Sequence, residues 1–407
     1  MIFVNNMTYP FLSIIGIGED GINSLSDQAR RCLKNASYVF GGKRHLRLAN
    51  TLIQGQTEIW SSPIQESINK INNLKPESVA ILASGDPFWY GIGPLAVQSL
   101  AINDWQSFPT LSSYSLACNR LGWSGQTIET ISLCGRSLET LRPALIPGRR
   151  TLILSENEST PHNVKAYLEK WQIPYKLFYI LEALGGPRER IRSFLLKESL
   201  PGTIDPLNMI ALELDRFEGL PYCHGRKDSY FRHDGQLTKQ YIRTATLSAL
   251  QPFPGALLWD IGTGSGSIAI EWMLTHPGCK AIAIESRHDR AVRARENAYS
   301  LGVPSLKIIE GKAPEALDKL PRPDAVFIGG GLTAPDLLKT VWRNLHPYGR
   351  LVINSVTTES DQILFQTQQQ LGGTISRLQI QHYESLGNYH GFRPDRTITQ
   401  YCVTRLP

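Results

Sequence analysis

The residues with the clearest chemical meaning form a glycine-rich turn in the second half of the chain. An apolar run, LLWDI (257–261), is followed by glycines at alternate positions, Gly262, Gly264 and Gly266. Glycine has no Cβ, so the backbone of such a turn can adopt positive φ angles and come close to a ligand. A helix that begins directly after the turn, over 267–275, would point its free N–H groups at that ligand. The pattern therefore predicts a strand, a tight turn and a helix that bind a nucleotide-like molecule.

The acidic residue Glu285 narrows the choice of ligand. It ends a second apolar run, KAIAIE (280–285), 19 residues after Gly266, where a carboxylate can accept hydrogen bonds from a ribose. Dinucleotides and S-adenosylmethionine both carry a ribose. The dinucleotide fingerprint has two residues between its second and third glycines, whereas Ser265 alone separates them here. Asp260, two residues before the first glycine, is typical of methyltransferases, so the sequence favours S-adenosylmethionine.

Three further segments of the second half could contribute to a site. EGKA (310–313) follows a predicted strand and could contact an adenine ring through backbone groups. FIGGG (327–331) has glycines where amino-directed nucleic-acid methyltransferases place Asn or Asp and two prolines, and a bare glycine floor suits a large flat substrate. HDGQLTK (233–239) precedes a helix that begins near Gln240, and Thr238 could either cap this helix or lie over a bound cofactor as a lid. Each segment could also be an ordinary loop.

The first half contains three polar or glycine-rich loops. IGIGEDG (15–21) has glycines whose spacing does not match the dinucleotide fingerprint. SGDPF (84–88) holds the carboxylate of Asp86 in a glycine–proline turn, where it could meet hydroxyls or amines of a ligand or simply form an Asx-type turn. PTLSS (109–113) offers hydroxyl groups at the start of a helix.

Strand and helix signals alternate in the first half, and the predicted elements must hold these loops in place. We expect strands over 11–17, 79–83, 127–133, 151–154, 175–181 and 207–214. We expect one helix from Ser24 or Ser26 to about Ala36, and others over 93–100, 113–121, 162–171 and 187–197. This alternation predicts an α/β fold with largely parallel sheets.

The second half shows the same alternation around the glycine turn. We expect strands over 257–260, 280–285, 306–310, 324–329 and 350–354, and helices over 288–300, 335–345 and 359–370. Two last strands, 374–381 and 397–403, could pair as a hairpin across an intervening loop. An alternating β/α series that ends in an antiparallel strand is the methyltransferase variant of the doubly wound fold.

Length and composition indicate the number of domains and the kind of partner to expect. The 407 residues suggest two or three domains, and an apolar fraction of 42% is enough for hydrophobic cores. We place domains at 1–216 and 230–407 and a linker at 217–229, which lacks periodicity and contains Pro and Gly. The net charge of +6 is spread evenly without a basic stripe, so nucleic acid is not the expected partner. A mildly basic surface or a polyanionic small substrate explains this charge.

Cysteine spacing and hydropathy give no sign of a metal site or a membrane segment. The cysteines stand at 32, 118, 134, 223, 279 and 402, without a CxxC pair or a cysteine–histidine cluster of metal spacing. We therefore expect free thiols in a reducing cytoplasm and no bound metal. The N-terminus lacks a basic region followed by an apolar one, and no apolar run reaches about 18 residues, so we expect no leader and no membrane span.

The stretches that carry these motifs resemble methyltransferases of corrinoid synthesis. The first half resembles the tetrapyrrole methyltransferases in IIGIGEDG (14–21), ASGDPFWYGIG (83–93), PTLSSYSLA (109–117) and LEALGGPRERIR (181–192). The second half resembles the C15-methylating, decarboxylating enzymes in HDGQLTKQYIR (233–243), LLWDIGTGSGSIAIEW (257–272), PDAVFIGGG (323–331) and GRLVINSVTTES (349–360). Both halves in this order resemble the fused C5,15-methyltransferases of cobalamin biosynthesis, over nearly the whole chain.

The resemblance implies a first domain of two α/β subdomains, a Rossmann-like class I methyltransferase domain, and two S-adenosylmethionine sites per chain. In the second domain the implied contacts are Thr238, Asp260, Gly262, Thr263, Gly264, Ser265, Gly266, Glu285 and Ala313. In the first they are Gly16, Ser84, Gly85, Asp86, Ser112, Ser113, Leu184 and Gly185. The family often has a His–Gly–Arg turn after the strand at 127–133, whereas this chain has Cys134-Gly135-Arg136, so a polar role of that histidine does not carry over.

The implied reaction is methylation of precorrin-6Y, or its cobalt form, at C5 and C15 with decarboxylation of the ring C acetate. Electron-rich meso carbons can attack a sulfonium methyl group directly, so positioning is the main task and no catalytic residue is assigned. Arg136, Lys239 and Arg243 are candidates to bind the carboxylates of the tetrapyrrole, although each could be an ordinary surface charge.

We expect a homo-oligomer that binds neither nucleic acid nor membranes. Two alternatives remain open. The chain could be an RNA methyltransferase with an N-terminal substrate-binding domain, which would show salt-dependent affinity for RNA. One domain could also be a non-enzymatic scaffold or a sensor of the methyl donor.

Overall fold

The computed structural model describes residues 10–407, which fold into two compact units. The first unit extends to Phe217, except that residues 139–143 group with the second unit, which begins at Glu218. The expectation that the chain has no leader concerns mainly residues 1–9, which lie outside the described residues. No helix in the described part of the chain is long and apolar enough to cross a membrane.

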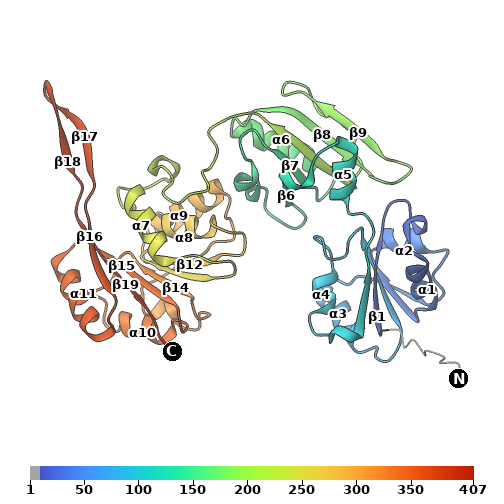
Figure 1. Ribbon diagram of the computed structural model, residues 1–407, viewed down its shortest axis with the longest axis horizontal. Coiled ribbons are helices and arrows are strands. Elements are labelled where there is room, and N and C mark those ends of the chain that lie inside the picture. The colour runs from blue at the N-terminus through green and yellow to red at the C-terminus, as the bar shows by residue number, and fades with distance from the viewer. Residues whose placement is uncertain (1–9) are drawn as a thin grey trace. The chain divides into compact units, whose positions relative to one another are not determined.

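The first unit begins with a parallel sheet in the strand order β3-β2-β4-β1-β5 (Figure 1). Its strands are β1 (Leu12–Ile17), β2 (Tyr38–Gly41), β3 (Gln56–Ile59), β4 (Val79–Ser84) and β5 (Trp105–Phe108). Helices α1 (Asp27–Asn35) and α2 (Lys43–Ala49) pack on one face of the sheet, and α3 (Ile64–Asn72) and α4 (Gly93–Val97) pack on the other. Apolar side chains on both faces of β1 and β4 explain why these strands are buried and parallel.

A second sheet completes the first unit, in the order β6-β7-β10-β8-β9. Its strands are β6 (Ile128–Ser132), β7 (Arg150–Leu154), β8 (Tyr175–Glu182), β9 (Arg190–Phe194) and β10 (Asn208–Leu214), with helices α5 (Ser113–Leu121) and α6 (Thr160–Lys170). Only β6 and β7 run parallel, and the other neighbours are antiparallel. The prediction of largely parallel sheets is therefore correct for the first sheet and wrong for the second.

The helix predicted over 187–197 is wrong, because this segment contains β9. Arg190 and Arg192 lie two residues apart on β9, and both guanidinium groups reach Glu182 on the neighbouring strand β8. This period-two pairing fixes an extended backbone. The helix start predicted at Ser24 or Ser26 is confirmed at Ser26, whose hydroxyl accepts a hydrogen bond from the Ala29 N–H.

The second unit contains a sheet in the order β13-β12-β11-β14-β15-β19-β16. Its strands are β11 (Leu257–Ile261), β12 (Lys280–Glu285), β13 (Lys307–Glu310), β14 (Ala325–Ile328), β15 (Arg350–Ser355), β16 (Thr374–Leu378) and β19 (Ile398–Thr404). Strands β11 to β15 are parallel, and β19 is antiparallel to both of its neighbours, as predicted for this fold.

Helices cover both faces of this sheet. Helices α7 (Gln240–Leu250), α8 (Ser267–Met273) and α9 (His288–Leu301) pack into one core, and α10 (Leu337–Asn344) and α11 (Thr358–Leu371) pack into the other. The strand order reverses between β11 and β14. In sheets of this type, ligands bind in the crevice at the carboxyl ends of the strands where the order reverses. The glycine turn after β11 lies at this point.

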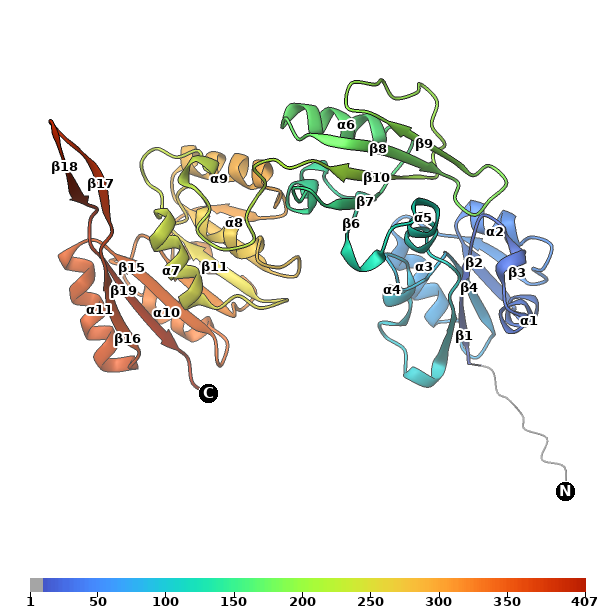
Figure 2. The same ribbon diagram turned by 45° about the horizontal axis from the view of Figure 1, so that its top comes forward.

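The predicted pairing of the last two strands is confirmed by β16 and β19, but the segment between them is not a simple loop. It forms a separate hairpin of β17 (Gln381–Leu386) and β18 (Tyr389–Pro394), which projects from the rest of the second unit (Figures 1 and 2). The side chains of this hairpin are almost all exposed. Its sequence lacks the alternation of apolar and polar residues that marks a half-buried strand, and for this reason the two strands were not predicted.

The segment predicted as a linker, 217–229, is in part integrated into the second unit. The N–H groups of Gly225 and Arg226 donate to the carboxylate of Glu271 on α8 at 2.7 and 3.0 Å. Arg226 is buried. The C-terminal part of this segment is therefore fixed to α8 rather than free.

Candidate active sites

The glycine turn of the second unit has a backbone conformation that favours glycine at three positions. Gly262, Gly264 and Gly266 have φ angles of 70°, 59° and 81°, which L side chains rarely adopt. A Cβ on Gly262 would lie 2.9 Å from the backbone nitrogen of Gly330, in the FIGGG segment after β14. The two glycine-rich segments thus contact each other through their backbones and form one floor at the switch point.

Glu285 ends β12 beside this turn, as the sequence predicts. Its Oε2 accepts a hydrogen bond from the Gly264 N–H at 2.9 Å, and its Oε1 accepts one from the Arg287 N–H at 3.0 Å. Two backbone donors therefore fix the orientation of the carboxylate, and the side chain lines the adjoining cleft. A carboxylate held in this way can still accept hydrogen bonds from ligand hydroxyls.

Asp260 supports the turn from beneath and does not line the cleft. It is buried, and its Oδ2 accepts hydrogen bonds from the Thr263 hydroxyl at 2.5 Å and the Ala269 N–H at 3.1 Å. Burial raises the pKa of Asp260 to about 6, and the negative charge of Glu285 adds to this effect. The prediction that Asp260 contacts the cofactor is therefore corrected to a role in shaping the turn and the start of α8.

Ser265 and Gly266 also shape the turn from outside the cleft. The Ser265 carbonyl accepts a hydrogen bond from the Asn297 side chain at 2.8 Å, and a Cβ on Gly266 would lie 3.1 Å from the Cβ of Ala294 on α9. Neither residue lines the cleft. Their small size allows α8 and α9 to approach each other, so we no longer assign them a direct contact with the cofactor.

The cleft above the turn has a volume of about 860 Å³. Of the residues predicted from the sequence, seven line it: Thr238, Lys239, Gly262, Thr263, Gly264, Glu285 and Ala313. Lys312, in the predicted segment 310–313, lines it too, and three charged or polar lining residues that the sequence analysis missed are Arg290, Asn354 and Arg396. The volume is at the upper end of the range for small-molecule pockets, which suits a nucleoside together with part of a second ligand.

The segment 233–239 borders the cleft and is tied to α9. Asp234 accepts a hydrogen bond from Arg290 at 2.9 Å, and Arg293 lies 3.4 Å away. The hydrogen bond from Arg290 holds the pKa of Asp234 well below its usual range. Thr238 is not the N-cap of α7, because Lys239 occupies that position. The reading of Thr238 as part of a lid stays a prediction.

Arg243 does not face the cleft, so its prediction as a substrate ligand is wrong. Its side chain is fully buried, and its Nε donates to Glu271 at 2.7 Å. The other guanidinium nitrogens donate to Asp228 and to the carbonyls of Arg226 and Thr238. All of these bonds hold α7 to α8 and to the segment before α7, which is a structural role. Lys239, in contrast, is half exposed and lines the cleft.

In the first unit, three loops meet at the carboxyl edge of the parallel sheet, where β4, β1 and β5 are neighbours. A Cβ on Gly16 would lie 1.8 Å from the Gly85 carbonyl oxygen, and one on Gly85 would lie 2.9 Å from the Cα of Ser112. The Thr110 N–H donates to that same Gly85 carbonyl at 3.1 Å. The structure therefore brings together the predicted residues of all three loops, through contacts that only glycine permits.

The polar side chains of these loops have local partners. Ser112 caps α5 by accepting a hydrogen bond from the Ser115 N–H at 3.2 Å, with Ser113 as the first helical residue, and Asp86 accepts one from the Phe88 N–H at 2.8 Å. The Asx-type turn considered for Asp86 is thus present. It occupies only Oδ1, so Oδ2 can still accept hydrogen bonds from a ligand.

Ser84 lies against two basic side chains of α2. Its hydroxyl is 2.7 Å from Nη2 of Arg44 and 2.8 Å from Nε2 of His45. Burial lowers the pKa of His45 to about 4, and the charge of Arg44 adds to this effect, so the imidazole is neutral near pH 7. Nothing in the sequence near Ser84 indicates these partners.

The loop after β8 carries Leu184 and Gly185 to the same edge. A Cβ on Gly185 would lie 3.3 Å from Leu116 of α5, and one on Gly186 would lie 2.5 Å from the Cβ of Glu19, in the loop after β1. The side chain of Leu184 is buried in a core with Leu181 and other residues, so only its backbone can face a ligand.

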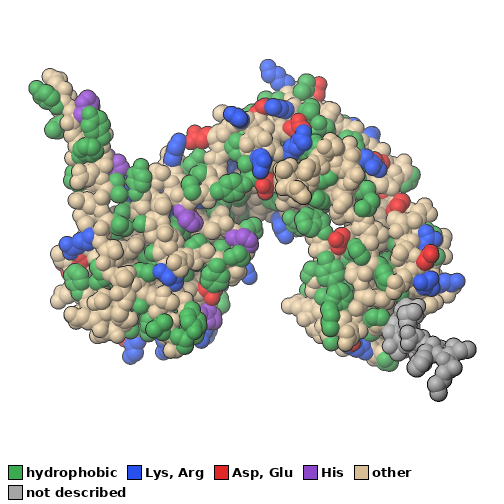
Figure 3. Space-filling model, in the orientation of Figure 1, with side chains coloured by type: hydrophobic (Ala, Val, Ile, Leu, Met, Phe, Trp, Pro, Cys, Tyr) green, Lys and Arg blue, Asp and Glu red, His purple; other side chains and the backbone are tan. Residues whose placement is uncertain are grey.

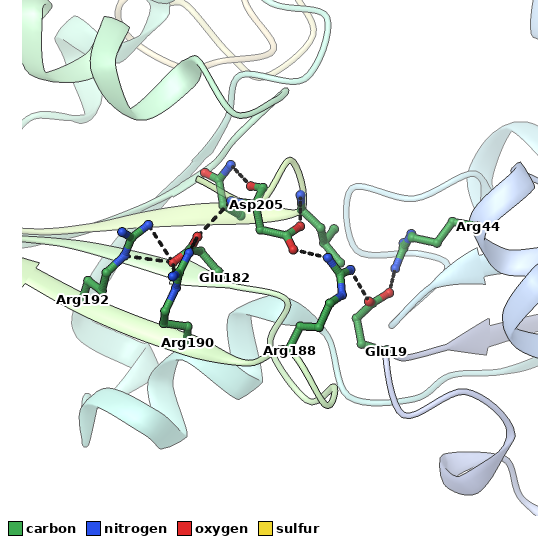
Figure 4. A network of polar contacts seen from close by, with 9 residues as sticks. Glu19, Arg44, Glu182, Arg188, Arg190, Arg192 and Asp205 are labelled. Carbon is green, nitrogen blue, oxygen red and sulfur yellow. Dashed lines mark hydrogen bonds and ion pairs between the residues drawn. The ribbon is translucent and has the colours of Figure 1, made fainter. Parts of the chain in front are cut away.

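A chain of ion pairs links this loop to the parallel sheet (Figure 4). Glu19 pairs with Arg44 of α2 and, at 3.4 Å, with Arg188, which also pairs with Asp205. Deeper in the second sheet, Glu182 accepts hydrogen bonds from Arg190, Arg192 and the Asp205 N–H. Burial alone would raise the pKa of Glu182, but the hydrogen bonds from Arg190 and the Asp205 N–H and the positive arginine charges lower it.

Arg136 follows β6 and is exposed. Its guanidinium lies 5.8 Å from the centre of the Tyr90 ring. Cys134, at the position where the family often has histidine, donates its thiol to the Ser155 carbonyl at 3.3 Å. No group of three His, Cys, Asp or Glu side chains that could hold a metal ion occurs within residues 10–407.

Comparisons with known proteins cover both units. The family of tetrapyrrole (corrin/porphyrin) methylases matches residues 12–199, and the precorrin methyltransferase domain matches residues 229–405. A precorrin-6Y C(5,15)-methyltransferase (decarboxylating) of Sinorhizobium sp. is 42% identical over 399 residues, which are 97% of this chain and 97% of that protein. A protein of the same name from Mycobacterium tuberculosis (strain CDC 1551 / Oshkosh) is 37% identical over 96% of this chain and 99% of its own.

A solved structure also matches part of this chain. The crystal structure of the C-terminal domain of precorrin-6Y C5,15-methyltransferase from Rhodobacter capsulatus is 43% identical, with a TM-score of 0.44. The match covers 46% of this chain and 100% of that one.

Proposed function

Because the chain belongs to the family of precorrin-6Y C5,15-methyltransferases (decarboxylating), we propose that it methylates precorrin-6Y, or its cobalt form, at C5 and C15. The ring C acetate is decarboxylated in the same sequence, and the product is precorrin-8X. The observation that carries this proposal is an identity of 42% that extends over 97% of both chains and therefore over both units.

Each unit holds one S-adenosylmethionine site in this proposal. In the second unit the support is the floor where the backbones of Gly262 and Gly330 meet, beside a carboxylate, Glu285, held by two backbone N–H groups. In the first unit the support is the meeting of three loops at Gly16, Gly85 and Ser112. A nucleoside with a ribose and an amino-acid tail fits such sites, because backbone groups can approach it closely.

The first unit methylates C5, and the second methylates C15 and promotes decarboxylation. When bound, S-adenosylmethionine supplies a methyl group on a sulfonium, which an electron-rich meso carbon can attack. The residues of each site therefore have to hold two ligands in line, and positioning of this kind can supply about 7–11 kcal/mol of barrier reduction. The rigid glycine floors and the doubly anchored Glu285 meet this requirement.

Cationic side chains at the cleft of the second unit bind the carboxylates of the tetrapyrrole. Lys239, Lys312 and Arg396 line the cleft, and the described residues show no ion pair for Lys312 or Arg396. Arginine and lysine in such positions bind carboxylates by charge-assisted hydrogen bonds. The electron pair released by the departing carbon dioxide passes into the methylated, protonated macrocycle, so these residues need only hold the substrate.

The protein assembles as a homo-oligomer through the β17–β18 hairpin. Tyr383, Leu386, Tyr389 and Phe392 are between 65% and 78% exposed on this arm, where hydrophobic side chains gather (Figure 3). A two-stranded hairpin is only marginally stable alone in water, and its open edges can pair with another chain.

Sedimentation velocity tests the assembly and should show a smaller particle for a variant that carries both Tyr383→Ser and Phe392→Ser. An unchanged particle size would contradict the assembly.

Two substitutions test whether each unit catalyses a separate methyl transfer. Asp86→Ala removes a carboxylate of the first site, and Gly264→Arg fills the cleft of the second. We expect each variant to add one methyl group fewer than the wild type, at C5 and C15 respectively, as counted by mass spectrometry and located by NMR. If each substitution alone abolished both transfers, the two sites would not be independent.

A further inference from the structure

Three consecutive aromatic residues stand exposed directly after the Ser84–Asp86 turn. Phe88, Trp89 and Tyr90 are 40%, 44% and 48% exposed. Contiguous exposed patches of large apolar side chains are uncommon on soluble proteins and often mark binding surfaces. The predicted cofactor contacts of the first unit do not include these rings, so their exposure is not yet explained.

The loop that carries the rings is tightly wound. The Trp89 N–H donates to the Asp86 carbonyl at 3.1 Å, and the Gly93 N–H donates to the Pro87 carbonyl at 2.8 Å. A Cβ on Gly91 would lie 2.4 Å from the Pro87 carbonyl oxygen, so only glycine fits there. These bonds fix the positions of the aromatic residues between them.

The backbone of Tyr90 is strained. Its φ angle is 52°, in a region that bulky L residues rarely occupy. Its hydroxyl donates to the Thr130 carbonyl of β6 at 3.2 Å. Strain of this kind persists where the surrounding structure enforces it, and it clusters at functional sites.

The three rings point to different neighbours. Phe88 packs on Trp105, with ring centres 5.6 Å apart. Trp89 lies 5.3 Å from Tyr90, edge to face, and 5.5 Å from Tyr114 of α5. Phe88 is thus packed against its own sheet, whereas Trp89 and Tyr90 form a separate pair of exposed rings.

Arg136 lies beside this pair of rings. Its guanidinium lies 5.8 Å from the centre of the Tyr90 ring, and no carboxylate pairs with it among residues 10–407. An exposed cation beside two aromatic rings matches a ligand that is flat, conjugated and acidic at its edge, because rings stack on aromatic faces and guanidinium binds carboxylates.

We propose that Trp89, Tyr90 and Arg136 form a docking platform for the tetrapyrrole in the first unit. Because the two rings are perpendicular, one of them stacks on a face of the macrocycle and the other contacts that face with its edge, while Arg136 binds a carboxylate at the rim of the macrocycle. The platform begins three residues after Asp86, so it places the macrocycle beside the loops predicted to hold the methyl donor. This inference rests on the proposed C5 methylation and assigns its substrate-positioning residues.

The test compares three platform variants with a matched control. Trp89→Ala removes one ring and Arg136→Gln removes the charge. Tyr90→Asn removes the other ring and its hydrogen bond to Thr130, but Asn tolerates the positive φ angle of this position. Phe88→Leu is the control, since it changes an aromatic residue of the same loop that packs on Trp105.

Methylation at C5 is measured with precorrin-6Y under anaerobic conditions. We expect the KM for the tetrapyrrole to rise about tenfold in each of the three platform variants, because each loses an aromatic contact or a charge-assisted hydrogen bond. The KM for S-adenosylmethionine and the binding of S-adenosylhomocysteine should not change. Phe88→Leu should stay within about twofold of the wild type. An unchanged KM for the tetrapyrrole in both ring variants would overturn the platform.

Direct binding separates this inference from the proposed function. Uroporphyrin III, a stable tetrapyrrole octacarboxylate, is titrated while tryptophan fluorescence is followed. Weaker binding by Trp89→Ala and Tyr90→Asn than by the wild type supports the platform even if the wild type adds no methyl group at C5, in which case the proposed function alone fails. Equal binding curves for the wild type and both ring variants would overturn the platform. A change of oligomeric mass in place of a change in binding would overturn it too, and would show that the patch is an interface between chains.

Discussion

At the scale of single residues, two carboxylates beside the glycine turn of the second unit differ in their relation to the cleft. Glu285 lines the cleft and is held by the N–H groups of Gly264 and Arg287. Asp260 is buried behind the turn and stabilises it by accepting hydrogen bonds from Thr263 and Ala269. The sequence could predict that both acids belong to the site. It could not predict their different roles, because burial depends on how α8 packs over the strand.

The raised pKa of Asp260 gives a pH dependence of stability. Burial raises this pKa from its usual value of 3.8 to about 6, so the folded state binds the proton more tightly than the unfolded state. The resulting stabilisation is complete below about pH 4 and is lost as the pH rises to about 6. Asp260→Asn cannot ionise and should lack this loss.

Denaturant unfolding at a series of pH values measures the effect. The free energy of unfolding of the wild type, relative to Asp260→Asn, should fall by roughly 3 kcal/mol between pH 4 and pH 7. Parallel curves for the two proteins would refute a buried, titrating Asp260.

Arg243 is the clearest case of a residue whose role follows from burial. Removing it leaves Glu271 buried without its main partner, and breaking a buried ion pair costs about 3–5 kcal/mol. Arg243→Met should therefore lower the free energy of unfolding of the second unit by about this amount, as measured by calorimetry. Arg232→Met is the control, since both Arg232 and its partner Glu296 are exposed. Similar unfolding temperatures for both variants would contradict a structural role of Arg243.

At the scale of elements, the second unit was largely predictable because its strands are apolar and end at turns. The strand KAIAIE, for example, has the same bounds in the structure as in the sequence analysis. The first unit was harder, since β2, β3 and β5 have only four residues each. The hairpin β17–β18 was missed because its residues are exposed and show no apolar period.

Links between elements far apart in the sequence were also beyond prediction. The pairing of Glu19 with Arg188 spans 169 residues, and no local pattern indicates it. The same applies to the hydrogen bond between Asp234 and Arg290, which holds the segment 233–239 to α9. Such pairs form only after both elements have packed, so they cannot be inferred from spacing.

The Asp234–Arg290 pair should tune cofactor binding in the second unit. Asp234→Ala frees the segment that borders the cleft, and a partly exposed ion pair contributes at most about 1 kcal/mol, so affinity for S-adenosylhomocysteine should fall by up to about fivefold. Glu296→Gln is the control, because Glu296 of α9 pairs with Arg232, which lies outside this segment. If Asp234→Ala bound with the wild-type affinity in calorimetry, the segment would not act as a lid.

At the scale of the whole molecule, the chain combines two units that each carry glycine-rich loops at the carboxyl ends of parallel strands. In the first unit these loops meet at Gly16, Gly85 and Ser112, and in the second at Gly262 and Gly330. The two assemblies are built from unrelated sequence motifs and different strand orders. Two separate sites for one methyl donor would let a single polypeptide modify two carbons of the same macrocycle.

Calorimetric titration of the full-length protein with S-adenosylhomocysteine tests this claim most directly. We predict two binding sites per chain for the wild type, and one for Gly264→Arg, whose remaining site belongs to the first unit. A stoichiometry of one in the wild type, or the loss of all binding in Gly264→Arg, would contradict two independent sites.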